Sequence, residues 1–517
     1  EVNQSGVVLM PRIEISNFDG GLWLSVPEDK IPDGGLAKAK GVDPLKTISI
    51  RSRNGQTAVT GVIVSHSLTR FNDNRYVGTA TQLLRDGATV TVIDAVFDNI
   101  GAFDGTRLAF SNMQVGLTKK DNLFVAGGGA VFPAHALTPV PPQGSNAILL
   151  PAQLCKVDST GVATRWGITN ETQNTQPALT VALIAGASFT VPGTYQWRAV
   201  YRNSTTGTVS NPTVPFIKVL TAPQVPTDIR IEANQNLVDP QVDKVDYYRT
   251  VLDGSVFFFA GSIDINPLAP AFDDQVADAD LGAEIQFDNT VPSATFEDCF
   301  GPHVGRMWWA RINEDGLRGR VVYSPIGRPE SQDGGFLDLA SDDENTQKII
   351  GWNGALWVLS EKWLYQVVGF DEPFRFRQVM GTPGTIAPHT VVGTPSGLIW
   401  MAQDGLRGFD GAQSRLIGFD ALGKLFRGEA AGGNPAFEGV TAAFVRGEYM
   451  ISNGVETYAL DLNTETWREV GKEFNALYWE PDTDELLVSD TASGKVMLHE
   501  SEGVFTDDGA AIAFELE

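Results

Sequence analysis

Carboxylates are the most abundant residues able to do chemistry, with 63 Asp and Glu among 517 residues. Two of them facing each other about 5–10 Å apart would form a glycosidase site, and the sequence does not give that distance. One acidic cluster lacks the spacing of a calcium loop, so we expect solvated charge at strand ends. Its members are Asp273, Asp274, Asp278, Asp280 and Glu284. Segment 341–344, Ser-Asp-Asp-Glu, is expected to be an exposed turn.

Other reactive residue types do not form a recognisable motif. The five histidines include no pair at metal-ligand spacing, so a zinc or iron site is not expected; they are His66, His135, His303, His389 and His499. Cys155 and Cys299 lie far apart and are interpreted as buried structural thiols. Segment 493–495, Ser-Gly-Lys, lacks the upstream glycine of a phosphate-binding loop, and segment 489–494 fails the aspartate-box pattern of sialidases. The sequence therefore predicts no catalytic, cofactor-binding or metal-binding residue and a protein that is not an enzyme.

Six tryptophans could form platforms for sugar rings. At strand positions such residues more often belong to the core, which is the interpretation we favour. They are Trp308, Trp309, Trp352, Trp357, Trp363 and Trp400.

The net charge is −25, from 38 Lys and Arg against the 63 carboxylates. This balance disfavours a protein that coats nucleic acid or binds anionic membranes, because both surfaces attract basic proteins. No apolar run approaches the roughly 18–20 residues of a membrane span. The longest, 178–191, is expected to form paired strands, and the first residues do not resemble a signal peptide.

Repeated strand–turn–strand units make up much of this chain, so the residues of any functional site must be positioned by them. In the C-terminal half, a strand, a short polar turn and a second strand recur about every 40–50 residues, which is the period of a four-stranded propeller blade. The five instances are 307–324, 355–367, 398–409, 448–460 and 486–498, and two weaker copies are 75–85 and 107–126. The pattern predicts an all-β protein with a propeller of about six or seven blades. Two ordinary β-sandwiches with coincidental spacing remain the alternative.

The composition changes between the two groups of repeats. A Pro-rich connector, 139–151, precedes a strictly alternating segment, 193–202, and a second strand pair at 245–259. These segments predict an inserted β-sandwich of immunoglobulin or fibronectin type III character. The expected organisation is an extended segment at 1–48, propeller blades at 49–144, the sandwich at 145–285 and further blades at 286–517. The best candidate for a helix is the short segment 421–426.

The order of these segments resembles the β-propeller tail nozzle proteins of short-tailed bacteriophages. The segments that carry the resemblance are 15–22, 27–42, 272–282, 306–311, 323–331, 352–354, 384–392 and 401–411. Each segment alone matches the family only weakly, and the resemblance rests on the segments occurring in the same order. The sequence departs from the family pattern at 40–42, where Lys-Gly-Val stands in place of an ending in Asn-Val.

The resemblance implies a structural protein of the virion. A ring, expected to be a hexamer of this chain, would extend the tail channel, hold the genome, and let double-stranded DNA pass without specific binding. Its partners would be the tail adaptor and portal proteins and the tail fibres or spike, with no membrane span. The negative charge agrees with a channel that does not grip DNA. The alternatives are a carbohydrate-binding or polysaccharide-cleaving propeller of the receptor-binding kind, and a secreted adhesin that binds through the sandwich.

Overall fold

The computed structural model describes residues 56–80, 82–92, 107–115, 120–128, 152–169, 179–233, 239–265, 271–417 and 439–499, apart from positions 63, 90 and 342, together with short strands elsewhere. Most of segment 15–42, most of the connector 139–151 and all of the expected helix 421–426 lie outside the described residues.

Strands dominate the described residues, which confirms the all-β class. Eight sheets contain four or more strands; seven of them pack together, and we call these sheets 1 to 7 and, together, the seven-sheet body. Sheet 1 contains β7 (Ser65–Phe71), β8 (Asn74–Thr79), β9 (Leu83–Arg85) and β10 (Ala88–Thr89). Sheet 2 contains β12 (Leu108–Val115), β13 (Lys120–Gly127), β17 (Gln153–Asp158) and β18 (Val162–Arg165), with β11 (Thr91–Val92) and β14 (Val131–Phe132) added. Sheet 3 contains β27 (Phe296–His303), β28 (Arg306–Ile312), β29 (Arg320–Tyr323) and β30 (Gly335–Asp338).

The remaining four sheets follow in chain order. Sheet 4 contains β31 (Thr346–Trp352), β32 (Ala355–Ser360), β33 (Trp363–Val368) and β34 (Arg375–Pro383). Sheet 5 contains β35 (Val392–Thr394), β36 (Gly397–Ala402), β37 (Gly405–Phe409) and β38 (Ser414–Leu416). Sheet 6 contains β39 (Thr441–Val445), β40 (Glu448–Ser452), β41 (Thr457–Asp461) and β42 (Thr466–Glu469), extended by β3 (Ala39–Lys40) and β48 (Glu515–Leu516). Sheet 7 contains β43 (Phe474–Glu480), β44 (Glu485–Asp490), β45 (Lys495–His499) and β6 (Thr57–Val62).

The predicted strand pairs are hairpins of these sheets. All five C-terminal repeats coincide with the second and third strands of sheets 3 to 7, which are antiparallel. Several first hairpins turn through two residues with positive φ, such as Asn353 and Gly354 at 49° and 73°. That conformation gives a tight turn whose twist matches the strands. Local turn chemistry therefore sets the repeat.

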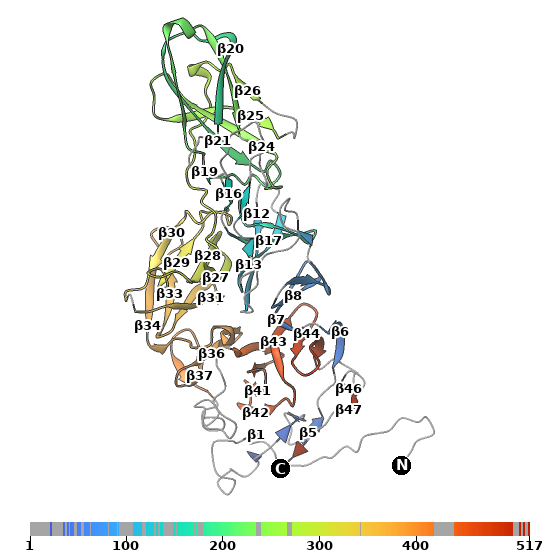
Figure 1. Cartoon of the computed structure of the whole chain (residues 1–517). Coiled ribbons are helices and arrows are strands. Elements are labelled where there is room, and N and C mark those ends of the chain that lie inside the picture. The colour runs from blue at the N-terminus through green and yellow to red at the C-terminus, as the bar shows by residue number, and fades with distance from the viewer. Residues whose placement is uncertain are drawn as a thin grey trace.

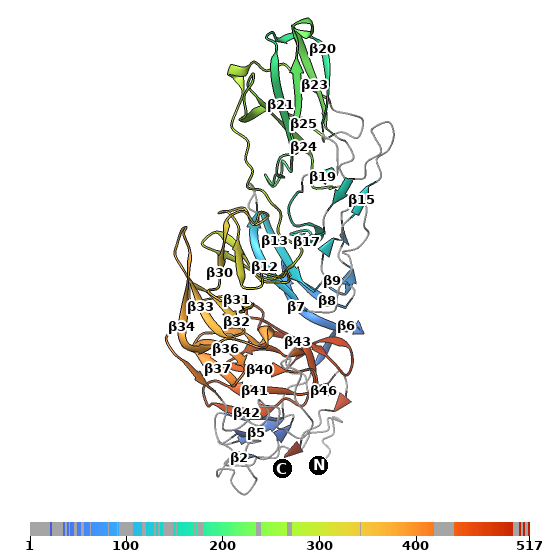
Figure 2. The same cartoon turned by 60° about the vertical axis from the view of Figure 1, so that its left-hand side comes forward.

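Each sheet packs on the next through a separate apolar cluster. Six clusters join sheets 1 to 7 in order, and a seventh joins sheet 7 back to sheet 1. In that last cluster Leu487 and Val496 of sheet 7 contact Leu68 and Val77 of sheet 1. The first strands of the sheets also contact one another in the same order, and β43 contacts β7. The packing order of the seven sheets is therefore cyclic (Figures 1 and 2).

A side-chain hydrogen bond accompanies each of these seven contacts. The bonds, in order, are Leu108 N to Ser67 Oγ, Ser111 Oγ to Gly301 O, Arg311 N to Thr346 Oγ1, Trp352 Nε1 to Thr394 O, Tyr449 Oη to Thr390 O, Ser452 Oγ to Phe474 O and Ser489 Oγ to Ser65 O, at 2.8–3.0 Å. Because buried backbone groups must be satisfied, these bonds align neighbouring sheets as well as joining them.

Sheet 7 takes its fourth strand from the other end of the chain. β6 pairs antiparallel with β45, and Gln56 Nε2 lies 2.7 Å from His499 Nδ1 across 443 positions of sequence. The cyclic order is thus completed by an early strand.

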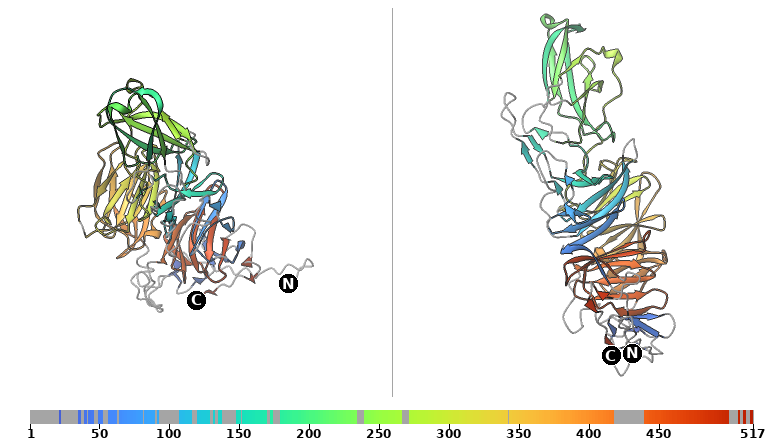
Figure 3. Two further views of the ribbon diagram at one scale, coloured as in Figure 1. Left: turned by 45° about the horizontal axis from the view of Figure 1, so that its top comes forward. Right: turned by 90° about the vertical axis from the view of Figure 1, so that its right-hand side faces the viewer.

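A separate two-sheet unit, residues 179–274, follows sheet 2 in the chain. One sheet contains β20 (Leu179–Phe189), β23 (Thr227–Ala233) and β26 (Ala271–Asp274); the other contains β22 (Phe216–Leu220), β21 (Gly193–Arg202), β24 (Lys244–Thr250) and β25 (Phe257–Asp264). Both contribute to one core that includes Trp197, Ile229 and Tyr247. Figure 3 shows this unit, in green, projecting from one end of the seven-sheet body.

Two details differ from the sequence expectation. Within segment 178–191, residues Leu179–Phe189 form one long strand, β20, whose pairing with β23 shifts register between Ile184 and Phe189. Residues 153–165 fall within the range expected for the inserted sandwich, but β17 pairs with β13 of sheet 2.

The remaining described elements are short. They are β15 (His135–Leu137), β16 (Ile148–Leu150) and β19 (Thr172–Gln173), which form one sheet, the pairs β1 (Gly21–Leu22) with β2 (Gly35–Leu36), β4 (Val42–Leu45) with β5 (Ser49–Ser52) and β46 (Thr506–Asp507) with β47 (Ala510–Ala511), and the 3₁₀ turns η2 (Ala222–Gln224), η3 (Asp278–Asp280) and η4 (Pro388–Thr390). Within the part of the chain that the structure describes, no helix is long and apolar enough to span a membrane.

Candidate functional site: the central cavity

The largest cavity described lies where the seven sheets meet. Its volume is about 840 Å³, and every sheet, or the segment leading into it, contributes to the lining. We call it the central cavity; its lining is Val64, Ser65, His66, Ala80, Arg107, Arg311, Gln347, Ile386, Pro388, His389, Gly439, Asn453 and Asn475. Both charged residues of this lining are arginines.

Arg107 enters the central cavity just before β12. Its two terminal nitrogens each donate to a backbone carbonyl at 2.6 Å, one of His66 and one of Gly439. Burial lowers the pKa of Arg107 to about 10, so the guanidinium stays protonated at neutral pH. These bonds hold the side chain in place without neutralising its charge.

Arg311 reaches the central cavity from an irregular position in β28. Its φ is +53°, a left-handed value that costs energy for a residue with a side chain, and its backbone N–H bonds Thr346 of sheet 4. Its Nε lies 3.0 Å from Glu297 Oε2. The two terminal nitrogens donate no hydrogen bond within the described residues. A strained backbone thus presents a guanidinium with unused donors.

A third cation lies near the central cavity and is paired with a carboxylate. Lys348 of β31 pairs with Asp298 at 2.7 Å, and Asp298 also accepts from the backbone N–H of Ile349. The pKa of His389 lies well below its ordinary value, first because the ring is buried and then because Arg107, Lys348, Arg311 and His66 are near it. His389 is therefore neutral at physiological pH.

The lining also offers uncharged hydrogen-bond donors. Asn453 uses its Oδ1 to accept from the backbone N–H groups of Val455 and Glu456. Its amide nitrogen and the side-chain amide of Asn475 have no partner among the described residues. The lining contains no carboxylate, and its two histidines are His66 and His389.

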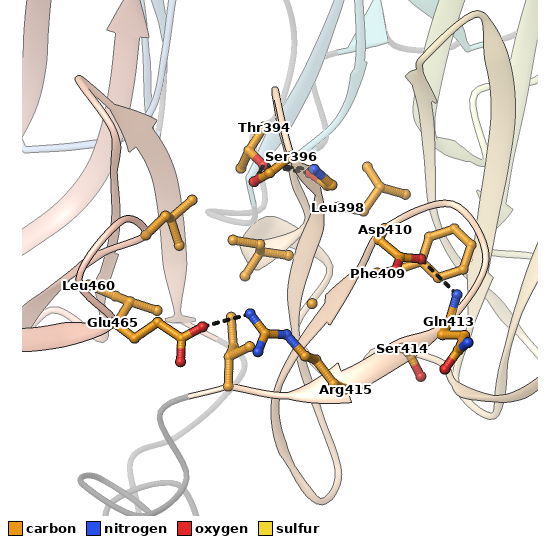
Figure 4. A pocket seen from close by; sticks show the side chains of 15 residues that line it. Thr394, Ser396, Leu398, Phe409, Asp410, Gln413, Ser414, Arg415, Leu460 and Glu465 are labelled. Atoms are coloured by element: carbon orange, nitrogen blue, oxygen red, sulfur yellow. Dashed lines mark hydrogen bonds and ion pairs between the residues drawn. The ribbon is translucent and has the colours of Figure 1, made fainter.

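A second pocket lies between sheets 5 and 6. Its volume is about 420 Å³, and a bridge of 2.7 Å between Arg415 and Glu465 crosses it (Figure 4). Asp410 Oδ1 accepts from the backbone N–H groups of Ala412 and Gln413, and these bonds lower the pKa of Asp410. A general acid of a glycosidase needs a raised pKa, so Asp410 does not fit that role.

The structure changes the interpretation of the acidic cluster. Asp274 is fully buried in the core of the two-sheet unit, 2.9 Å from Arg249 Nε, and accepts from Trp197 Nε1. Asp278 also pairs with Arg249, and Asp273 with Arg230. The expectation of solvated charge is wrong for Asp274, because an arginine on the facing sheet compensates its burial. No group of His, Cys, Asp and Glu suited to a metal ion occurs within the described ranges.

Glu344 also contradicts the expectation of an exposed turn. It is buried and accepts from Ser360 and from the hydroxyl of Tyr365. It therefore connects the loop after sheet 3 to the interior of sheet 4.

The expected thiols and most tryptophans are core residues. Cys155 and Cys299 are buried and free, and burial raises the pKa of both thiols, that of Cys155 to about 12. Trp308, Trp309, Trp357 and Trp400 are buried, whereas Trp352 is half-buried and Trp363 is exposed. Of the histidines, His66 and His389 meet in the central cavity.

Sequence patterns do not identify the two arginines of the central cavity. Arg107 and Arg311 lie 204 positions apart, and although each falls within a repeated strand pair, 107–126 and 307–324, the pattern does not single out either of them. The only sequence feature that could point to them is that each lies next to a predicted blade strand, and many other residues have the same position.

No protein-family model matches the chain, and no curated protein does. Solved structures align along most of it with low scores. The computationally designed Ika8 protein aligns at 9% identity over 86% of this chain and 99% of its own, with a TM-score of 0.34. The extracellular domain assigned to a hybrid two component system of B. thetaiotaomicron aligns at 12% identity over 98% of this chain and 76% of its own, with a TM-score of 0.29. Scores this low do not bear on fold or function.

Proposed function

We propose that this chain is a seven-bladed β-propeller with an inserted sandwich and that it serves as a structural ring subunit of a short-tailed phage tail, the nozzle. The observation that carries the proposal is the cyclic order of seven sheets, five with four strands and two, sheets 2 and 6, with six. Four-stranded sheets stacked around one axis are the construction of a propeller. The position of the two-sheet unit between the second and third sheets matches the order of the resemblance.

The charge of the chain supports a passage for DNA. A subunit of charge −25 repels phosphate, so a channel made from several copies would let DNA slide without binding. Closed rings of identical subunits use heterologous contacts that return to the first subunit. A rigid propeller, held by seven apolar clusters, is a suitable unit for such a ring.

Electron microscopy of the purified full chain, alone and mixed with tail adaptor and portal proteins, tests this role. We expect closed rings of constant subunit number, at least in the presence of the adaptor, and antibody against the chain on the tails of virions. A protein that stays monomeric in every mixture and does not label virions would contradict the proposal.

A carbohydrate-binding or polysaccharide-cleaving propeller is the alternative. Among the described carboxyl groups, a raised pKa occurs at Asp239 and Asp274, and both are buried away from the two pockets described above. This placement does not favour glycosidase chemistry. Turnover of host polysaccharide by the purified chain would support the alternative instead.

A further inference from the structure

The central cavity combines positive charge with unused hydrogen-bond donors. Arg107 is charged and bonded to backbone carbonyls, and Arg311 keeps two terminal nitrogens free of protein partners among the described residues. The amides of Asn453 and Asn475 add neutral donors, and the lining contains no acid. Such a set is complementary to a ligand that carries negative charge and several acceptor oxygens.

The balance of charges around the central cavity is positive. Glu297 pairs with Arg311, and Asp298 pairs with Lys348, so these carboxylates compensate two of the three cations. Arg107 donates to carbonyl oxygens alone. The whole chain has a charge of −25, so the excess positive charge at this cavity has the opposite sign to the net charge. The cavity also shields this charge partly from water.

The conformation of Arg311 is a second observation, independent of charge. A left-handed φ at an arginine within a strand persists only where the surroundings impose it, and irregular strand positions often redirect a side chain toward a site. With the left-handed φ, the backbone N–H of Arg311 donates to Thr346 of the next sheet, and the guanidinium of Arg311 lies in the lining of the cavity.

We propose that the central cavity is a binding site for an oxyanion of the phosphate class, held by the guanidinium groups of Arg107 and Arg311 and by the amides of Asn453 and Asn475. Planar guanidinium groups bind phosphate oxygens through paired, charge-assisted hydrogen bonds. The volume of about 840 Å³ exceeds that of one phosphate, so a ligand that carries phosphate on a small organic group also fits. This inference is independent of the role in a phage tail.

Titration calorimetry of the full chain with inorganic phosphate, at constant ionic strength against chloride, tests the proposal. The Arg311→Gln variant should bind phosphate at least about tenfold more weakly, because a charged hydrogen-bond donor is lost. The matched control is Arg415→Gln, which removes an exposed arginine from the other pocket and should leave phosphate binding unchanged.

A second variant keeps the test decisive if Arg311→Gln unfolds. Asn475→Asp preserves size and places a carboxylate in the lining, so it should also weaken binding, while circular dichroism reports the fold. Absence of phosphate binding by the unaltered chain, or equal binding by it and by folded variants of Arg311 and Asn475, would overturn the proposal.

Discussion

The two-sheet unit and the seven-sheet body contain two arginines, Arg249 and Arg311, whose charges are matched to different extents. In the two-sheet unit, Arg249 is 0% exposed, pairs with Asp274 and Asp278, donates to the carbonyl of Val276, and lies against an aromatic ring of Phe189. In the seven-sheet body, Arg311 is 32% exposed and its one carboxylate partner leaves two nitrogens unused. The charge of Arg249 is matched by carboxylates within the protein, whereas Arg311 keeps hydrogen-bond donors unused among the described residues. An arginine whose donors are all used by protein carboxylates and carbonyls is expected to have a structural role. An arginine with unused donors is expected to belong to a binding site.

The largest effect on stability is expected at Arg249 of the two-sheet unit. Arg249→Met should destabilise the two-sheet unit by about 3–5 kcal/mol, because the carboxylate of Asp274 then remains buried without its cation. Calorimetry should show one unfolding transition moving to lower temperature. The control is Arg230→Met in the same unit, whose pair with Asp273 is exposed and should contribute less than about 1 kcal/mol. Equal effects of the two variants would break the comparison.

A buried carboxyl group at the junction of the two regions should respond to pH. Asp239 precedes β24 and is near Arg165 and Lys156 of sheet 2, and burial raises its pKa to about 6. Since the folded pKa lies above the unfolded value, the stabilisation is complete below about pH 4 and is lost as the pH rises through 6. Asp239→Asn should therefore be more stable than the unaltered chain by about 2–3 kcal/mol at pH 7.5 and equally stable at pH 4.

Denaturant unfolding at both pH values measures this difference. Asp243→Asn is the control, because Asp243 is exposed nearby, where it accepts from Ser204. A stability difference for Asp239→Asn that does not change with pH would show that its carboxyl group is solvated.

The smallest effect on stability is expected in the central cavity. Arg311→Gln should change the free energy of unfolding by less than about 1 kcal/mol in the absence of phosphate, since its pair with Glu297 is partly exposed. Thermal unfolding in chloride buffer measures it. A loss as large as that of Arg249→Met would mean that Arg311 is structural, and the comparison between the two regions would fail.

The sequence predicted what depends on neighbouring residues. Hairpins such as β32–β33 follow from alternation and turn residues, and β21 coincides with the predicted segment 193–202. Burial of Asp274 depends on Arg249, 25 positions earlier on the facing sheet, so it had no local sign. The central cavity is even harder to predict from sequence, because residues from seven sheets that are far apart in the chain form its lining. The roles of the chain in a virion stay predictions.

The pairing of β6 with β45 has a consequence for biosynthesis. The early strand emerges from the ribosome long before its partner, since Gln56 and His499 are 443 positions apart. Until translation is nearly finished, β6 exposes an unpaired edge, and sheet 1 exposes the apolar face that later packs on sheet 7. Folding of the nascent chain therefore ends with a long-range docking step, during which a chaperone or rapid completion of synthesis would protect against aggregation.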